Sequence, residues 1–350
     1  MIEERGIKLG IEPEEEPTKE SEVFYNPEMT VNRDISTAAL QVYQSRSGKD
    51  LEILDALSAT GVRGLRYLKE VPGVDRAVLN DSKPEAFDNI ERNLELNSID
   101  SGRAESANKD ANLLMTERRK GFDFVDIDPF GSPARFTDSA VRSMKHEGFA
   151  GFTATDLATL CGTYRKTCKR RYASWSLNTS YCHEVGLRVL IKFLFESFAR
   201  FDRVFRPKIA FAEKHYYRVM GEVRHSKKAV NRMLDNIGFL KHCENCAFRE
   251  LVEEAVRDRC PDCDEKLHLL GPIWIGKLGR KKFCKEVVDV LKNKDREDAA
   301  EIVEKLEKET IIKTPYYDTH KLAKVVGSPA PSRGSLLEQI NNKGYRAVRT

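Results

Sequence analysis

The residues best suited to chemistry lie in the segment Asp128-Pro129-Phe130-Gly131. An amine attached to a nucleobase is a poor nucleophile, because its lone pair is delocalised into the ring. A carboxylate and a main-chain carbonyl can together accept both N–H hydrogens, and the carboxylate can take the proton released during reaction. Asp128 and the Pro129 carbonyl would fill these roles while Phe130 stacks on the base. A strand-terminating Asp-Pro turn is the structural alternative.

A nucleoside-binding loop is the second candidate site. The loop SATGVRG follows an apolar run, and Asp81 lies about 20 positions after Gly61. Glycine lets the backbone approach a ligand, and the carboxylate can accept from both ribose hydroxyls. The loop lacks the G-x-G-x-x-G spacing of dinucleotide folds, and Asp55 precedes it at the strand end. We therefore favour S-adenosylmethionine over NAD and count Asp55 among the cofactor-binding residues, although a structural turn would also explain Gly61 and Gly64.

Four cysteines form two knuckles with the spacing of metal ligands, Cys243-x2-Cys246 and Cys260-x2-Cys263. Two knuckles separated by a short polar stretch can place four thiolates tetrahedrally around Zn²⁺. Because cysteine fills all four positions, no position is left for water, and we predict a structural zinc site. A redox pair is the alternative, although no thioredoxin-like pattern accompanies the knuckles. The other cysteines lack paired spacing and are expected to be ordinary thiols.

The elements that must position these residues alternate in type through the first two-thirds of the chain. Apolar runs cover 51–57, 76–81, 123–131 and 149–156, and residues 83–96 have the apolar spacing of a helix. This alternation predicts an α/β fold with a doubly wound, Rossmann-like parallel sheet. Ligands of such sheets lie beyond the carboxyl ends of the strands, which is where the candidate residues occur.

Charge and composition divide the chain further. Residues 1–22 hold eight acidic and three basic side chains, so a total charge of +4 leaves +9 on the remainder. Basic residues are densest at 165–171 and 203–228, and in the second stretch they interleave with aromatic residues. This pattern suits a phosphate backbone and unstacked bases, although a solvated charged face explains it equally well. From about residue 201 the composition shifts and predicts a smaller α+β domain. Its last two predicted helices and the terminal YRAVRT resemble a winged helix or form a packing element.

The class of protein is bounded by length and composition. A chain of 350 residues that is 40% hydrophobic can form two packed domains. No apolar run approaches the roughly 18 residues that span a bilayer, and the opening MIEERGIK is not a secretory signal. Eight cysteines in such a chain indicate reduced thiols or metal ligands. We expect a cytoplasmic protein without membrane contact and take a monomer as the default oligomeric state.

Longer strings in the sequence resemble one enzyme family, the tRNA guanine-N2 dimethyltransferases that act on guanine 26. The resemblance covers nearly the whole chain from Phe24. The strings that carry it are FYNPEMTVNRDIS, LDALSATGVRGLR, LNDSKPEAFDNIERN, KDAN, DIDPFGSP, TATDLATLCG, CHEVGLRVL, GPIWIGKL and YYDTH. The resemblance implies an S-adenosylmethionine-dependent methyltransferase domain at 23–200. It also implies a tRNA-binding domain at 201–350, which would contain the zinc site predicted from the cysteine spacing.

Site residues are carried over from the family string by string. Arg33 of the NRD string and Arg63 of the ATGVRG loop would reach the cofactor carboxylate, and Asp81 would hold the ribose. Asp110 would accept from the adenine amine, and the Ala111 N–H would donate to an adenine nitrogen. The resemblance also implies Asp128 as the catalytic residue.

Two other functions stay open at this point. The Asp-Pro-Phe chemistry serves any exocyclic amine, so an amino-methyltransferase for another base in RNA or DNA is one alternative. A zinc-containing RNA-binding module without catalysis is the other. The presence of both Asp81 and Asp128 argues against the second alternative. The sequence leaves open whether one or two methyl groups are added.

Overall fold

The structure is a computed structural model that describes residues 1–12, 23–256 and 258–349. The acidic segment predicted at 1–22 therefore lies largely outside the described residues. Its described part forms a small antiparallel hairpin of β1 (Ile2–Glu4) and β2 (Ile7–Leu9).

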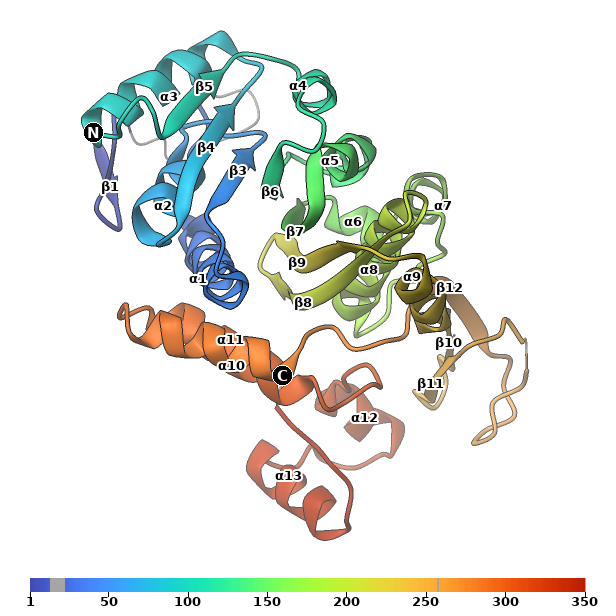
Figure 1. Cartoon of the computed structure of the whole chain (residues 1–350). Coiled ribbons are helices and arrows are strands. Elements are labelled where there is room, and N and C mark those ends of the chain that lie inside the picture. Colours follow the sequence, from blue (N-terminus) through green and yellow to red (C-terminus); the bar gives the residue numbers. More distant parts are fainter. Residues whose placement is uncertain (13–22, 257, 350) are drawn as a thin grey trace.

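A seven-stranded sheet forms the centre of the molecule, with the strand order β5-β4-β3-β6-β7-β9-β8 (Figure 1). The five parallel strands are β3 (Leu51–Asp55), β4 (Val74–Asn80), β5 (Ala104–Ala107), β6 (Phe122–Ile127) and β7 (Met144–Ala154). They confirm the four strands predicted from apolar runs. From β3 the chain continues to β4 and β5 on one side and later to β6 and β7 on the other. The switch point between β3 and β6 is where doubly wound folds bind their ligands.

Helices cover both faces of this sheet. The first face carries α1 (Thr30–Ser47), α2 (Val62–Glu70) and α3 (Pro84–Leu96), and the second carries α4 (Ala111–Glu117), α5 (Thr137–Ser143) and α8 (Cys182–Ala199). Because successive strand residues point to opposite faces, Ile53 and Phe124 pack in the first core, whereas Leu54 and Val125 pack in the second. Burial on both faces explains why these strands read as continuous apolar runs.

The domain boundary predicted near residue 201 differs from the structure. β8 (Arg203–Glu213) and β9 (Tyr216–His225) pair antiparallel at the edge of the same sheet, next to β7. The predicted amphipathic stretch at 283–310 is two helices, α10 (Lys281–Lys292) and α11 (Glu297–Glu309), which return to pack near α1 in the first core. Their apolar stripes need a partner, and the large sheet domain supplies it.

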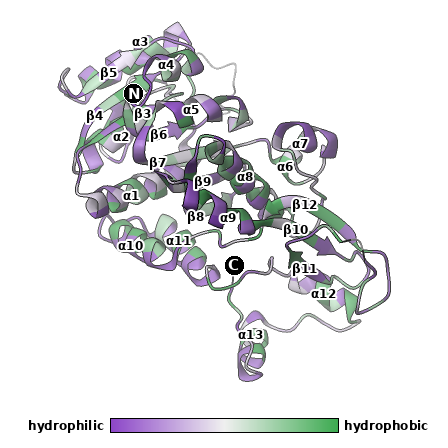
Figure 2. Cartoon of the chain, turned by 45° about the vertical axis from the view of Figure 1, so that its right-hand side comes forward, coloured by the Kyte–Doolittle hydropathy of each residue, from purple (hydrophilic) through white to green (hydrophobic). Residues whose placement is uncertain are grey.

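A smaller unit contains the cysteine knuckles and lies apart from the sheet (Figure 2). Its antiparallel sheet has the order β11-β10-β12 and consists of β10 (Ile237–His242), β11 (Arg249–Val252) and β12 (His268–Trp274). α12 (Thr319–Val325) begins at the predicted cap Asp318, and α13 (Arg333–Asn342) follows. Within the described residues no strand follows α13, so residues 345–349 form no wing.

The remaining elements are short. They are η1 (Pro27–Met29), η2 (Pro133–Phe136), α6 (Leu157–Leu160), α7 (Arg165–Tyr172), α9 (Lys227–Met233) and η3 (Leu234–Asn236). Across the described ranges, no helix combines the length and the apolar character that a membrane crossing requires.

Candidate active site

The loop Asp128-Pro129-Phe130-Gly131 leaves the carboxyl end of β6 at the switch point. Thr155, just after β7, fixes this loop through two hydrogen bonds to Gly131. The Gly131 N–H donates to Thr155 Oγ1 at 2.7 Å, and the Thr155 N–H donates to the Gly131 carbonyl at 2.8 Å. Pro129 is buried, whereas the Phe130 side chain is 54% exposed and contacts the Phe24 ring edge-on at 4.5 Å. The loop thus presents a carboxylate beside an exposed aromatic ring.

Arg63 joins this loop to the loop after β3. Its guanidinium donates to Asp128 Oδ2 through Nη2 and to Asn32 Oδ1 through Nη1 at 3.0 Å. Burial alone would lower the pKa of Arg63, but Asp128 and Asp126 outweigh it and hold that pKa well above its ordinary value. The structure therefore gives Arg63 a carboxylate partner within the protein, and that partner is the predicted catalytic residue.

A second buried charge pair lies beneath the site, and the sequence analysis missed it. Arg218 of β9 donates to Asp126 Oδ1 at 2.8 Å and to Oδ2 at 2.6 Å, and Tyr67 donates to Oδ2 at 2.5 Å. Both charged side chains are completely buried. Burial would raise the pKa of Asp126, but Arg218 and Arg63 hold it below its ordinary value. The signal in the sequence was a charged residue with apolar neighbours in each strand, since buried charges require partners.

Asp55 ends β3 and is completely enclosed. Its Oδ2 accepts from the Gly64 N–H at 3.1 Å, which fixes the glycine loop to the strand. Burial, reinforced by the negative charge of Asp126, raises the pKa of Asp55 to about 7. A Cβ atom at Gly64 would lie 2.7 Å from Leu79 Cγ, and Gly61 has a φ of +76°. Both glycines are thus required by packing and backbone conformation, whatever ligand the loop binds.

Asp81 and Asp110 follow β4 and β5 at the same edge of the sheet. Asp81 accepts from the Ala59 N–H at 2.9 Å through Oδ2 and from the Lys83 N–H at 3.0 Å through Oδ1. Asp110 caps α4, and its Oδ1 accepts from the N–H groups of the second and third helical residues. Ala111 is the first residue of α4, so its N–H has no partner within that helix. Asp81 thus contacts the glycine loop directly, and the cofactor contacts of Asp81, Asp110 and Ala111 stay predictions.

Arg33, also predicted to reach the cofactor, lies in a different ion pair. It donates to Glu4 of β1 through Nε at 2.8 Å and through Nη2, and to the Asn26 carbonyl at 3.0 Å. Burial would raise the pKa of Glu4, but Arg33 and Arg66 lower it to about 2. Arg33 thereby anchors the segment that places Phe24 against Phe130. A contact between Arg33 and the cofactor stays a prediction.

The four knuckle cysteines come together in loops of the small unit. Their Sγ atoms all lie within 4.8 Å of one another, with Cys243 and Cys263 3.5 Å apart and Cys246 and Cys260 3.3 Å apart. The Cys243 N–H donates to the Phe248 carbonyl at 2.9 Å, which closes the first knuckle. A tetrahedral zinc with four Zn–S bonds of about 2.3 Å separates its sulfurs by roughly 3.7 Å, so these residues fit the ion.

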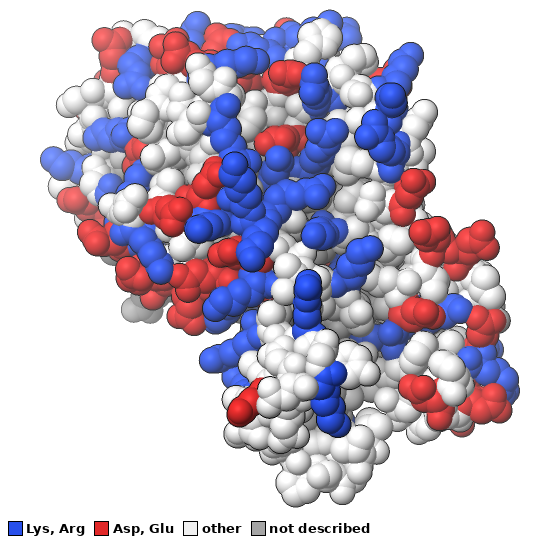
Figure 3. Space-filling model, turned by 60° about the horizontal axis from the view of Figure 1, so that its bottom comes forward, with Lys and Arg blue, Asp and Glu red and all other residues white. Residues whose placement is uncertain are grey.

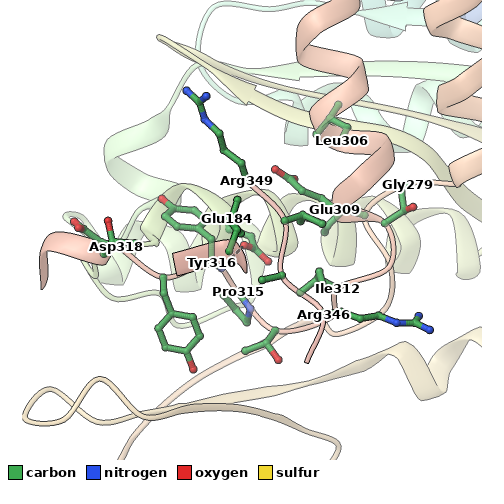
Figure 4. Close-up of a pocket in the computed structure, with 18 of the residues that line it drawn as sticks. Glu184, Gly279, Leu306, Glu309, Ile312, Pro315, Tyr316, Asp318, Arg346 and Arg349 are labelled. Carbon is green, nitrogen blue, oxygen red and sulfur yellow. Dashed lines mark hydrogen bonds between the residues drawn. The ribbon is translucent and has the colours of Figure 1, made fainter. Parts of the chain in front are cut away.

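Two cavities lie outside the glycine loop. The larger, of about 790 Å³, is bounded by α8, α11, α13 and the tail after α13 (Figure 4). Glu309 faces it, and burial together with Glu184 raises the pKa of Glu309 to about 7. The second, of about 470 Å³, shares Glu184 and Glu309 with the first and also includes His183 and Tyr217. Since Tyr217 pairs with Ala154, the last residue of β7, this cavity lies next to the carboxyl end of that strand.

Fold and site together define a methyltransferase of the doubly wound α/β class, with its cofactor loop at the strand switch point. A family described as N2,N2-dimethylguanosine tRNA methyltransferase matches residues 8–350. This chain belongs to that family.

Individual relatives agree with this assignment. A tRNA (guanine(26)-N(2))-dimethyltransferase of Methanosphaera stadtmanae is 36% identical over 100% of this chain and 91% of its own length. A tRNA (guanine(26)-N(2)/guanine(27)-N(2))-dimethyltransferase of Aquifex aeolicus is 36% identical over 94% of this chain and 86% of its own. The solved structure of Trm1 from Pyrococcus horikoshii in complex with S-adenosyl-L-methionine matches with a TM-score of 0.85 and 31% identity. That match covers 95% of this chain and 91% of the solved one.

Proposed function

We propose that this protein transfers one or two methyl groups from S-adenosylmethionine to the exocyclic N2 of guanine 26 in tRNA. Relatives at 36% identity over nearly their full length bear that activity in their names. The observation that carries the proposal in this chain is the loop after β6, which combines the Asp128 carboxylate, the buried Pro129 and the exposed Phe130 ring at the switch point.

Asp128 is the proposed proton acceptor. The amine nitrogen forms a bond to the methyl carbon while the carbon–sulfur bond breaks and its electron pair stays on sulfur. The proton then leaves the ammonium for the Asp128 carboxylate. Because the contact with Arg63 uses Oδ2, Oδ1 is available to accept one amine hydrogen, and the Pro129 carbonyl accepts the other. Phe130 would stack on the guanine.

The proposed cofactor residues surround the glycine loop. S-adenosylmethionine supplies an activated methyl group when bound. Asp81 would accept from the ribose hydroxyls, Asp110 from the adenine amine, and the Ala111 N–H would donate to an adenine nitrogen. Arg63 would pair with the amino-acid carboxylate, because it lies in the first turn of the helix that follows the glycine loop and its guanidinium is next to Asp128.

The proposed tRNA path joins both parts of the protein. Figure 3 shows that Lys and Arg side chains gather in the middle of the face that carries the C-terminal helices. Four arginines also line the larger cavity, Arg188, Arg333, Arg346 and Arg349. Guanine 26 must leave its stack to reach Asp128, at a cost of a few kcal/mol, so the backbone on either side of it has to be held.

The cysteine cluster is proposed to bind one structural Zn²⁺ through Cys243, Cys246, Cys260 and Cys263. Four thiolates complete a tetrahedral shell and leave no position for water. The ion would cross-link the two knuckles of the small unit. Its contribution is therefore to folding of that unit rather than to methyl transfer.

The proposed function is tested by incubating the protein with unmodified tRNA transcript and labelled S-adenosylmethionine. Nucleosides are then identified by mass spectrometry, and the position is mapped with a transcript that carries adenine at position 26. We expect N2-methylated and N2,N2-dimethylated guanosine that disappears with the substituted transcript. Methylation of a different base, or of no base, would contradict the proposal. Because the Aquifex relative is also named for guanine 27, a second transcript should carry a substitution there.

A further inference from the structure

α7 is a short, strongly basic helix that projects from the body beside α6 (Figure 2). Its sequence RKTCKRRY contains no acidic residue. Five of its cations are exposed, Arg165, Lys166, Lys169, Arg170 and Arg171. Two large aromatic side chains flank it, Tyr164 at 59% exposure and Trp175 at 41%. Exposed aromatic rings among cations are the composition of a surface that binds nucleic acid.

Internal structure does not account for these charges. Only Arg171 has an ion-pair partner within the described part of the chain, Asp156 at 2.6 Å. Lys166 lies in the first turn of the helix, where the helix dipole disfavours cations. The cations of the last turn complement the dipole, but a solvated helix of eight residues does not require four cations that have no ion-pair partner within the described residues. A polyanionic partner would supply the negative charges that the described part of the protein does not place beside these cations.

The indole of Trp175 is held in place among the cations. Its backbone N–H donates to the Gly271 carbonyl at 2.8 Å and its carbonyl accepts from the Gly271 N–H at 2.8 Å, so the residue is anchored to the β10–β12 region. The Arg165 guanidinium carbon and Lys169 Nζ lie 6.0 and 5.8 Å from the ring centroid. An exposed ring with cations at its side can stack a base while the cations contact the neighbouring phosphates.

α7 is also coupled to the catalytic loop through a short chain of hydrogen bonds. Ser132, which follows the loop, donates to the Tyr172 hydroxyl at 2.6 Å, and Tyr172 donates to Asp156 at 2.8 Å. Asp156 adjoins Thr155, which holds Gly131. Tyr172 is the last residue of α7, so hydrogen bonds connect the basic helix to the loop that carries Asp128. A strand of nucleic acid held on α7 would have a fixed position relative to the methyl-transfer site.

We infer that α7, with Tyr164 and Trp175, is the surface that holds the tRNA backbone next to the target nucleotide. This inference rests on the proposed function and adds the site at which the substrate is positioned. The cations contact phosphates on one side of guanine 26, and Trp175 stacks on an unpaired base. A membrane or an acidic protein would not need the aromatic ring or the connection to Ser132.

The test compares two triple variants of equal charge. The first combines Lys166→Gln, Lys169→Gln and Arg170→Gln and spares Arg171, which pairs with Asp156. The control combines Arg118→Gln, Arg119→Gln and Lys120→Gln, which are exposed in the segment between α4 and β6. Dissociation constants for tRNA are measured over a range of salt concentrations, together with kcat, KM, thermal stability and S-adenosylmethionine affinity.

We expect the α7 variant to bind tRNA about 10- to 100-fold more weakly, with the slope of log K against log salt reduced by about 2 to 3. KM for tRNA should rise by a similar factor. The value of kcat at saturating tRNA and the dissociation constant for S-adenosylmethionine should stay within twofold of the wild type, and the thermal stability should not change. Trp175→Ala should weaken tRNA binding about fivefold or more, and Trp175→Phe should restore most of it.

Equal tRNA affinity and equal salt slopes for the α7 variant and the control would overturn the inference. Activity of the wild type separates this outcome from failure of the proposed function. If the wild type methylates guanine 26 and the α7 variant binds tRNA normally, only the inference fails. If the wild type methylates no guanine in tRNA, the proposed function itself fails.

Discussion

Arg63, at the start of α2, and Asp128, in the loop after β6, form an ion pair at the strand switch point. The Arg63 side chain is 6% exposed and that of Asp128 is 19% exposed. We predict that Arg63→Gln lowers the methyl-transfer rate at least tenfold, because Asp128 loses the cation that positions it. The free energy of unfolding should fall by about 1 to 3 kcal/mol, the cost of leaving a partly buried carboxylate without its partner.

Urea unfolding and single-turnover kinetics check this prediction, with the exposed Arg119→Gln as the matched control. Unchanged rate and stability in the Arg63 variant would show that the pair is incidental.

Asp81 is predicted to hold the cofactor ribose. Asp81→Ala removes a carboxylate that would accept two hydroxyls and should weaken S-adenosylmethionine binding by about 2 to 4 kcal/mol, or roughly 30- to 700-fold. Asp81→Asn keeps one carbonyl oxygen toward the Ala59 N–H and should lose less. Calorimetric titration measures both variants, and the exposed Asp88→Asn on α3 serves as the control. Affinity of the alanine variant within twofold of the wild type would exclude the role.

Asp55 predicts a dependence of stability on pH. Its pKa rises from an ordinary 3.8 to about 7 in the folded protein. Between these values the folded state holds a proton that the unfolded chain has released, so the free energy of unfolding should fall as pH rises from about 4 to 7 and then level off. Asp55→Asn should reduce this slope by up to about 1 kcal/mol per pH unit. Glu309 acts in the same direction, so part of the slope remains.

Chemical denaturation at several pH values measures the effect, with Asp88→Asn again as the control. A slope equal to that of the wild type in the Asp55 variant would contradict the assigned pKa.

The sequence predicted the parts of the fold that depend on local pattern. Apolar runs and helical spacing located β3, β4, β6, β7 and α3. The spacing of the four cysteines predicted a cluster that the structure assembles. Pairings between distant segments could not be predicted in this way. The positions of β8 and β9 in the main sheet, and of α10 and α11 beside α1, depend on which exposed edge and which apolar face remain unfilled after the rest has packed.

In the site, too, local pattern could be predicted from the sequence, whereas contacts between distant residues could not. Asp55, Asp81 and Asp128 were predicted because each stands at the end of a strand that the pattern identifies, whereas Asp110 was predicted only from the resemblance to the family. The partners of charged groups were missed, because Arg218 and Asp126 are 92 positions apart and meet only through strand pairing. Arg33 was predicted to contact the cofactor from the resemblance to the family, and its ion pair with Glu4, 29 positions away, was not predicted.

The zinc proposal predicts about one zinc per chain. Replacing Cys243 and Cys246 with serine should abolish metal binding and loosen the small unit, while S-adenosylmethionine affinity stays within twofold. Arg249 of β11 lies 3.9 Å from the ring centroids of both Tyr181 and Tyr317, so loosening should also expose the C-terminal segment to protease.

Metal analysis, calorimetry and limited proteolysis check this prediction. Cys168→Ser, which alters a buried thiol outside the cluster, is the control. Protein prepared without chelators that contains no stoichiometric metal would contradict the proposal.

The proposed mechanism depends most directly on Asp128 as the proton acceptor. Asp128→Asn keeps the shape of the side chain and one acceptor oxygen, but it removes the charge that stabilises the developing ammonium and accepts its proton. The measurement is the single-turnover rate of methyl transfer to unmodified tRNA at saturating S-adenosylmethionine. We predict a rate about 10² to 10⁴ below that of the wild type, with cofactor and tRNA affinities nearly unchanged. A rate close to that of the wild type would show that Asp128 only shapes the turn after β6 and would contradict the mechanism.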